Sequence, residues 1–351
     1  MSRAQLTSTV EQNTGGAVSP YVAGKNKIIN GDFSFFQRGV TIAVSNNNYS
    51  YYTADRWNLT NGAVSGNAWT INQVATGDTT NLPNIRYAVR VQRNLGQTSG
   101  SGSYFAQFFE SSTSIPLAGK VVTLSFYARA GSNYSPTSNQ FSSIIYTGTG
   151  IDQNPVTGSY TGQVNTQSNF TLTTTWQRFT TTMTMPSNMT EIAVNFLAPS
   201  VGTAGANDYY ELTGVQLEAG PVATPFTTAT GTLSGELQAC QRYYWRDNTT
   251  TVSTNGHPCF GVAQSTTSGY FYMPFPVTMR IAPTSMNYSN VRPVQYGVAA
   301  YALSGMALST TETSPSVGVF YTSGSTGMIA NVPLFLYGAG SGNWIEFSAE
   351  L

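Results

Sequence analysis

Charged side chains are scarce in this sequence of 351 residues, which has 15 Lys and Arg against 15 Asp and Glu, or 9% of the chain. An ordinary soluble domain carries about 25%. Because the two signs cancel, the chain has no basic field that would attract nucleic acid and no polybasic patch that would bind an anionic membrane. We therefore expect neither nucleic acid nor a membrane among its partners.

Histidine is nearly absent, and carboxylates are few. His257 stands alone, which excludes zinc sites built from several histidines and leaves any Ser-His-Asp arrangement dependent on one residue. Hydrolysis of a polysaccharide needs two carboxylates across a cleft, and the spacing of the acidic residues predicts no such pair. The sequence therefore favours a protein that is not an enzyme and uses no cofactor, with a polysaccharide depolymerase as the less favoured interpretation.

Cysteines and long apolar runs are also rare or missing. Cys240 and Cys259 are the two cysteines, and in a reducing compartment we expect both to be buried free thiols rather than a disulfide. No stretch approaches the roughly 20 apolar residues of a membrane span, and residues 1–20 lack an apolar segment of signal-peptide length. The sequence thus predicts no membrane insertion and assembly in a cytoplasm.

Aromatic and uncharged polar residues are abundant instead. Aromatics make up 13% of the chain and hydrophobic residues 40%, which argues against disorder because disordered chains combine low hydrophobicity with high charge. With few Lys and Glu to keep exposed sheet edges from pairing with other chains, we expect those edges to be covered by sister subunits. The composition therefore favours an oligomer.

From Asn26 onward, short apolar runs are separated by Gly, Asn, Asp and Pro, a pattern typical of antiparallel β-sandwiches. Apolar and polar side chains alternate in residues 122–128, which predicts a half-buried sheet with Val122, Leu124, Phe126 and Ala128 facing the core. The predicted strands of the first domain are 27–29, 33–37, 56–60, 68–74, 86–91, 104–110, 121–129, 141–146, 176–184, 191–196 and 209–217.

Turn residues also divide the chain into segments. Residues 1–24 are polar and Gly-rich, with no apolar pattern, and the pair Gly220-Pro221 ends the last strand of the first domain because proline removes a ladder donor. Later strands are predicted at 270–275, 316–321, 328–336 and 343–347. We therefore expect an attachment arm at 1–24, a first β-domain at 25–220, a linker at 221–246 and a smaller β-domain at 247–351.

The linker carries the one convincing helical periodicity in the chain. Ser234 is its predicted N-cap, and Glu236 is predicted to lie away from its apolar face. A helix this short is only marginally stable in isolation. Its apolar face should therefore either dock on the chain's own domains or meet other copies at a molecular axis. The predicted interface residues are Leu233, Leu237, Cys240 and Tyr244.

Several segments resemble known virion proteins. NKIINGDFSFFQRG, YTADRW, KVVTLSFYARA, TTTWQRFT and YYELTGVQLE follow one another between Lys25 and Gly220. They resemble the jelly-roll modules of tailed-bacteriophage tail fibres, which are similar to carbohydrate-binding modules. The junction ATPF…ELQACQRYYW and the stretches MPFPVTMRIAPT and WIEFSAEL resemble parts that accompany these modules.

The resemblance implies an all-β fold class: an antiparallel jelly-roll sandwich and a second, smaller β-sandwich-like domain, joined by a short helical hinge. It also implies a virion protein assembled in the host cytoplasm, a homotrimer, contacts with other virion proteins through residues 1–24, and host-surface polysaccharide as ligand. A fibre adhesin is the favoured function. The alternative is a purely structural protein that decorates the capsid or anchors a fibre and binds only virion proteins.

Glycan recognition needs aromatic faces that stack on sugar rings, with amides and hydroxyls around them. Residues 46–52 crowd three tyrosines into a polar stretch without strand alternation, which suits a binding surface or a subunit interface equally. Trp57 stands in a strand-like run, where a large aromatic usually belongs to the core. The candidate glycan surface comprises Tyr49, Tyr51, Tyr52, Trp57, Trp69, Tyr87 and Tyr104.

The resemblance also raises the question of a structural calcium ion near the first strand. Asn30, Asp32 and Glu211 offer the oxygen ligands that calcium prefers. However, Thr213-Gly214 stands where such modules tend to place paired acids. We therefore predict no metal site, and these three residues are the candidates if one exists.

Overall fold

The computed structural model describes residues 23–45, 50–61, 64–82, 84–156, 158–249, 256–295 and 299–351. The chain forms two compact units: unit 1 ends at Glu236 and includes Leu351, and unit 2 runs from Leu237 to Glu350. The division falls inside helix α3 (Leu233–Gln241), within the segment that the sequence assigns to the linker. Of the predicted attachment arm, all but Ala23 and Gly24 lies outside the described residues.

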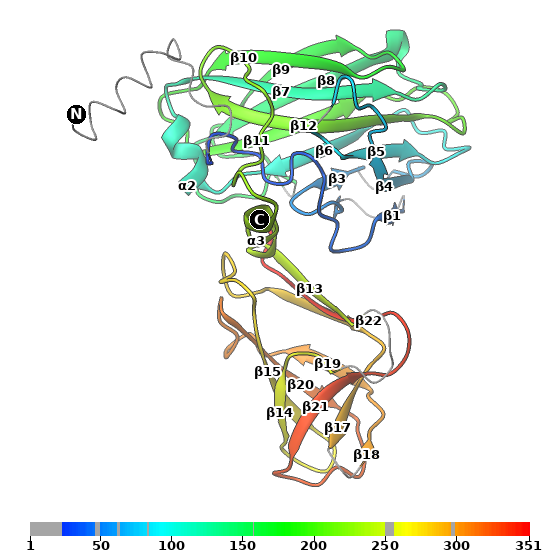
Figure 1. Cartoon of the computed structure of the whole chain (residues 1–351), viewed down its shortest axis with the longest axis vertical. Helices are drawn as coiled ribbons and strands as arrows, with labels where there is room; N and C mark the ends of the chain where they lie inside the picture. Colours follow the sequence, from blue (N-terminus) through cyan, green and yellow to red (C-terminus); the bar gives the residue numbers. More distant parts are fainter. Residues whose placement is uncertain are drawn as a thin grey trace, which may run out of the picture. The chain divides into compact units, whose positions relative to one another are not determined.

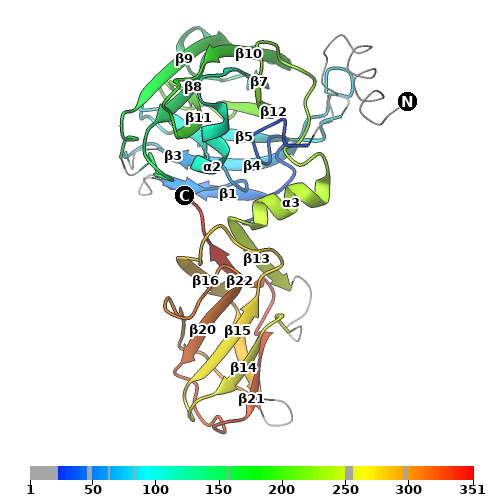
Figure 2. The ribbon, with the colours of Figure 1, turned by 90° about the vertical axis from the view of Figure 1, so that its left-hand side faces the viewer.

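Unit 1 is a sandwich of two six-stranded antiparallel sheets, which form two layers (Figures 1 and 2). This confirms the predicted jelly-roll sandwich. Sheet A contains, in spatial order, β1 (Thr41–Val44), β4 (Trp69–Ala75), β5 (Tyr87–Arg93), β12 (Tyr209–Ala219), β7 (Val121–Ala130) and β10 (Gln177–Thr184). Sheet B contains, in spatial order, β2 (Ser50–Tyr52), β3 (Asn58–Thr60), β6 (Ser103–Phe108), β11 (Glu191–Ala198), β8 (Gln140–Gly148) and β9 (Val164–Thr171). The short helices described in unit 1 are α2 (Ser111–Ser114), η1 (Ile115–Leu117) and η2 (Thr137–Asn139).

The core of unit 1 lies between the two sheets and is rich in aromatic rings. Trp57 lies parallel to Phe105 of β6, with 5.1 Å between ring centroids and 6° between ring planes. Phe141 and Phe196 stack in the same way at 5.7 Å. Strand β7 contributes its alternate residues, all fully buried as predicted: Val122, Leu124, Phe126 and Ala128.

The outer face of β7 is covered in part: the prediction of a half-buried sheet is wrong at Thr123 and Ser125, while Tyr127 and Arg129 on the same face remain partly exposed. Thr123 and Ser125 are each 1% exposed, because the segment that follows β12 crosses them. Thr123 Oγ1 donates to the carbonyl of Gly220 at 2.7 Å. Glu218 holds the crossing segment by accepting from the N–H of Thr224 at 2.9 Å and pairing with Lys25 at 3.3 Å.

The chain between Asn26 and Phe36 is irregular, so the predicted strands at 27–29 and 33–37 are wrong. Asn30 and Phe33 have φ angles of 57° and 55°, which strands do not accommodate. Backbone bonds to β12 remain only at isolated points, such as Lys27 N–H to the carbonyl of Leu217 at 2.9 Å. Side chains supply others: Asn26 Oδ1 accepts from the N–H groups of Ile28 at 2.9 Å and Leu217 at 3.1 Å.

Three strands of unit 1 were not predicted: β1, β2 and β9. All are edge strands of their sheets, and β2 and β9, with sequences SYY and VNTQSNFT, carry few apolar side chains. β2 has only three residues, and β9 alternates between exposed and half-buried positions without a buried one, so neither shows the clear apolar alternation by which strands are predicted. Tyr51 and Tyr52 thus lie in a strand, not in the polar loop that the sequence suggested.

Unit 2 is all-β as well, with a three-stranded and a seven-stranded antiparallel sheet. Its core is built around Phe271, Phe320 and Phe347, each fully buried. The predicted strand at 328–336 begins only at Pro333, since Asn331 takes a φ of 62°. The strands are β13 (Tyr244–Thr249), β22 (Asn343–Ser348) and β16 (Ser285–Ser289) in one sheet, and β18 (Ala299–Ala300), β17 (Val291–Gln295), β21 (Pro333–Gly338), β14 (Phe260–Ala263), β15 (Gly269–Pro274), β20 (Val317–Ser323) and β19 (Gly305–Leu308) in the other.

Helix α3 buries only part of the predicted apolar face, and it buries Glu236 as well. Leu233 is 65% exposed, Leu237 is half-buried, and Cys240 is buried, while Tyr244 belongs to β13 and not to the helix. The N-cap is Thr232 and not Ser234, because Thr232 Oγ1 accepts the N–H of Gly235 at 3.1 Å. The trimer that was predicted around this helix stays a prediction.

Glu236, predicted to lie away from the buried side of α3, is fully buried in unit 1. Its Oε1 accepts the N–H of Asn30 at 2.6 Å, and its Oε2 accepts the N–H of Thr230 at 3.2 Å. The first turn of α3 is therefore fixed to the irregular N-terminal segment by a carboxylate rather than by an apolar stripe.

Both thiols are free and buried, as predicted. Burial raises the pKa of Cys259 to about 12, so this thiol stays protonated at neutral pH. Among the described residues, no helix has the length and apolar character needed to cross a membrane.

Replacing Glu236 by Ala should lower the free energy of unfolding of unit 1 by about 2 kcal/mol, because the buried N–H of Asn30 loses its acceptor. Denaturant unfolding followed by tryptophan fluorescence measures this loss. Gln238→Ala, at an exposed position of the same helix, is the control and should change stability by less than about 0.5 kcal/mol. Equal losses in the two variants would contradict the role of Glu236.

The same carboxyl group should make unfolding depend on pH. Burial raises the pKa of Glu236, opposed by the N–H groups of Asn30 and Thr230 and assisted by Asp32. Because the pKa of this group is higher in the folded than in the unfolded state, its contribution to stability is fully present at a pH below the unfolded-state pKa. That contribution is lost as the pH rises through the folded-state pKa. As the pH rises above the ordinary pKa of glutamate, about 4.3, wild type should lose unfolding free energy relative to Glu236→Gln. Parallel pH profiles would show that this group does not titrate as expected.

Candidate functional site

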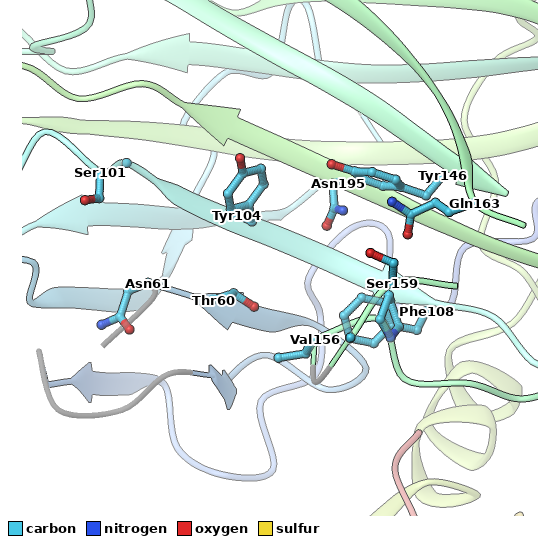
Figure 3. A pocket seen from close by; sticks show the side chains of 13 residues that line it. Thr60, Asn61, Ser101, Tyr104, Phe108, Tyr146, Val156, Ser159, Gln163 and Asn195 are labelled. Carbon is cyan, nitrogen blue, oxygen red and sulfur yellow. The ribbon is translucent and has the colours of Figure 1, made fainter. Parts of the chain in front are cut away.

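The face of sheet B that is turned away from the core bears a groove of about 260 Å³, which lies in unit 1. Its side chains come from β3, β6, β8 and β11 and from the loops beside them (Figure 3). The lining residues are Thr60, Asn61, Ser101, Gly102, Tyr104, Phe108, Tyr146, Pro155, Val156, Gly158, Ser159, Gln163 and Asn195.

Strand register brings the central side chains of the groove together. Phe105 and Phe196 belong to the core, so the adjacent Tyr104 and Asn195 point to the outer face. Asn195 lies opposite Ala106 in the pairing of β11 with β6. Because an alanine side chain is short, the space in front of Asn195 stays open.

Two tyrosine rings flank Asn195 (Figure 3). Tyr104 is 38% exposed, and Tyr146 is half-buried. Burial, and to a smaller extent the nearby phenol of Tyr104, raises the pKa of Tyr146. Its hydroxyl therefore stays neutral at physiological pH and can both donate and accept a hydrogen bond.

The amide of Asn195 is the least satisfied polar group of the groove. The residue is 8% exposed, and its Oδ1 is buried without a hydrogen-bond partner among the residues that the structure describes. Leaving such a group unpaired costs about 1–3 kcal/mol. No described neighbour holds the amide, so it can rotate to present its N–H₂ or its carbonyl to a bound molecule.

The described part of the loop between β8 and β9, residues 149–156 and 158–163, forms one wall of the groove. Tyr160 anchors this loop, because its ring is buried in a small cluster with Ala106, Phe108 and Ala193 on the outer face of sheet B. Its hydroxyl donates to the carbonyl of Ile192 at 3.1 Å. The wall is thus fixed to the same strands that carry the groove.

Another part of the rim, Ser101 and Gly102, is held in place by Arg93. This guanidinium is fully buried, and its Nη2 donates to the carbonyl of Ser99 at 2.8 Å. Its Nη1 lies 3.3 Å from the carboxylate of Asp208. The charge of Arg93 is therefore compensated inside the protein while its hydrogen bonds shape the rim.

The described lining of the groove contains aromatic rings, amides and hydroxyls but no charged side chain. Rings can stack on the apolar faces of sugars, and the amides and hydroxyls match sugar hydroxyl groups. A pair of carboxylates, as glycoside hydrolysis requires, is not present among these residues. The groove is suited to bind an uncharged, hydroxyl-rich molecule.

The predicted glycan-binding residues are dispersed over unit 1. Tyr104 lines the groove. Tyr51, 42% exposed, and Tyr52, whose hydroxyl donates to the carbonyl of Leu351 at 3.1 Å, lie on the edge strand β2 of the same sheet. Tyr49 lies outside the described residues.

The other three candidates do not lie at the groove. Trp57 and Trp69 are 0% and 2% exposed, and their indole N–H groups donate to Asn30 O at 3.1 Å and Asn67 Oδ1 at 2.8 Å. Both belong to the core, which corrects their assignment to a binding surface. Tyr87 lies on β5 of sheet A, with the guanidinium of Arg86 over its ring at 5.0 Å.

Sequence reasoning missed Asn195, Tyr146 and Gln163. Asn195 stands in the apolar strand EIAVNFLA, and a lone amide in such a strand is a usable signal because an inward amide would be unsatisfied. Tyr146 ends a predicted strand, but its outward direction depends on register. Gln163 reaches the groove through the folding of a loop, which carries no sequence signal.

The candidate calcium ligands are engaged with protein groups. The Asn30 side chain bonds the backbone of Phe35, and Asp32 accepts the hydroxyl of Ser34 at 2.6 Å. Glu211 is ion-paired with Arg90 and Arg129. Among the described residues, no group of three or more His, Cys, Asp or Glu side chains is placed to hold a metal ion.

Comparison with family models and with curated proteins finds no match. Among solved structures, the chain is similar to the enzymatically active domain of tailspike protein 4 of bacteriophage CBA120, with 14% identity over 57% of this chain and 22% of that one and a TM-score of 0.32. It is also similar to TmCBM61, solved with β-1,4-galactotriose, with 12% identity over 56% of this chain and 99% of that one and a TM-score of 0.30. A third similar structure is the C-terminal family 22 carbohydrate-binding module of Clostridium thermocellum Xyn10B, with 11% identity over 52% of this chain and 100% of that one and a TM-score of 0.29.

Gly148→Ala should displace the wall loop, because a Cβ at this position would lie 2.5 Å from Cβ of Tyr160. We expect a loss of about 1–3 kcal/mol in unfolding free energy and faster amide hydrogen exchange confined to residues 149–163. Gly158→Ala is the matched control, since nothing lies within 4 Å of a Cβ there. Unchanged exchange in Gly148→Ala would show that Tyr160 does not anchor the loop.

Proposed function

We propose that this protein binds a neutral glycan in the groove on sheet B and has no enzymatic activity. The observation that carries the proposal is the unsatisfied amide of Asn195 between two tyrosine rings. A polar group left without partners in a fixed, largely preformed concave site is the arrangement expected where a ligand supplies the missing hydrogen bonds.

The chemistry of the lining favours a sugar over other small molecules. Tyr104 offers a partly exposed ring, and the hydroxyls of Ser101, Ser159 and Thr60 can exchange hydrogen bonds with sugar hydroxyls. No described lining residue carries a charge that would call for a charged ligand. The ligand class proposed is therefore an uncharged saccharide, with one sugar unit at Asn195.

The wider proposal is that the chain is a virion fibre protein of a tailed bacteriophage that attaches to polysaccharide on the host surface. The sequence segments between Lys25 and Gly220 that resemble fibre modules support it. So does a charge content of 9%, which leaves sheet edges suited to contacts within an assembly. A homotrimer and contacts with other virion proteins belong to the same proposal.

Tyr104→Ala and Asn195→Ala should each weaken glycan binding about tenfold, equivalent to about 1.4 kcal/mol, because they remove the stacking ring and the unpaired amide. An array of neutral bacterial polysaccharides would identify a ligand, and calorimetry would measure the affinities. Tyr87→Ala, on the other sheet, is the control and should bind like wild type. Equal affinity of all four proteins would place the ligand elsewhere.

Incubation with the same polysaccharide tests the absence of enzymatic activity. We expect no release of reducing ends above the rate without protein, since the described lining offers no carboxylate. Release that disappears in Asn195→Ala would instead make the groove an active site, and release unaffected by that variant would place a hydrolytic site elsewhere in the chain.

A further inference from the structure

A second polar cluster lies on the outer face of the opposite sheet. Arg90, Glu211 and Arg129 form one row across β5, β12 and β7, since Glu211 is the register partner of Arg90 on one side and of Arg129 on the other. These three strands lie side by side in sheet A (Figure 1). The cluster is thus separate from the groove, which lies on sheet B.

Glu211 is fully buried and holds both arginines. Its Oε1 accepts from Nε and Nη2 of Arg90 at 2.8 and 2.6 Å. Its Oε2 accepts from Nε of Arg129 at 2.6 Å. One buried carboxylate therefore sets the position of two guanidinium groups, and the remaining N–H groups have no hydrogen-bond partner among the described residues.

Aromatic rings support both guanidinium groups from the side. Arg90 Cζ lies 4.1 Å from the ring centroid of Tyr209, and Arg129 Cζ lies 4.7 Å from that of Trp176. Such stacking restricts the rotation of a long side chain, so less entropy is lost when it binds a ligand. The arginine side chains remain 33% and 27% exposed, so part of each is accessible to solvent.

Within the row, two guanidinium cations share one carboxylate. Asp78 lies near enough to Arg129 to interact with it, so its negative charge offsets part of the positive charge, while its hydrogen bonds go to the N–H groups of Thr80 at 2.9 Å and Asn81 at 2.8 Å. The row itself therefore carries a net positive charge and presents fixed, planar N–H donors.

We propose that Arg90 and Arg129 together bind an oxyanion on the outer face of sheet A. Planar guanidinium forks match the two oxygens of a carboxylate and the oxygens of sulfate or phosphate. The oxyanion is either the carboxylate of an acidic sugar or a free inorganic anion. The site does not depend on the glycan groove, and it would allow the chain to recognise an acidic polysaccharide at a second point.

The experiment is a titration of ¹⁵N-labelled full-length protein with sodium glucuronate, sodium sulfate and glucose at constant ionic strength. We expect saturable shifts of the Arg90 and Arg129 Nε–H signals with the two anions and none with glucose. Tighter binding of glucuronate than of sulfate identifies an acidic sugar as the ligand, and equal or tighter binding of sulfate identifies a simple oxyanion. Linear shifts that never saturate, or shifts with glucose as well, would overturn the proposal.

Arg129→Lys keeps the charge but removes the fork, so affinity for either anion should fall about tenfold. Arg86→Lys is the matched control, because Arg86 also lies over a tyrosine ring, that of Tyr87 in sheet A, but is not a member of the row; the affinity of this variant should not change. Equal losses in both variants would overturn the proposal.

Glu211→Gln, if folded, should bind anions more tightly, since the competing carboxylate is gone. Tyr104→Ala should leave anion binding intact, which separates this site from the groove.

Discussion

The structure of unit 1 depends on one constraint: polar groups buried in a protein with few charges must be satisfied by particular side chains. Asn30 shows this most clearly. It is fully buried, its N–H donates to Glu236, its carbonyl accepts the indole N–H of Trp57, and its side-chain N–H₂ donates to the carbonyls of Phe35 and Asp55. An irregular segment with positive φ angles persists because these bonds replace those of a sheet.

The same constraint explains why both candidate surfaces arise where they do. Glu211 and Asn195 stand at outward positions of inner strands, where neighbours cover them from both sides. Glu211 is satisfied by two arginines, which leaves excess positive charge at the surface. Asn195 is left without a partner for its Oδ1, which leaves hydrogen-bonding capacity in a groove. In each case the buried polar residue decides the chemistry that the surface can offer.

Division of the sandwich into two faces also separates the two kinds of recognition. The described lining of the groove on sheet B contains uncharged groups, suited to sugar hydroxyls. The row on sheet A consists of charged groups held at fixed separation by pairing across three strands. The two proposed sites therefore lie on opposite faces of the sandwich, so that each can be tested by substitutions on its own sheet.

By itself, the sequence determined the all-β class and the inward face of β7, because the alternation of apolar and polar residues along a strand follows from which side chains face solvent. It also predicted the free thiols, since a reducing compartment disfavours a disulfide. The division between the two units falls inside α3, in the segment that the sequence assigned to the linker. Tertiary structure alone decided the rest: Trp69 became core, Glu236 was buried, and Tyr104, Tyr146 and Asn195 met in one groove. These outcomes depend on register between strands distant in sequence and on long-range bonds to side chains. No pattern along one segment specifies its partner in another.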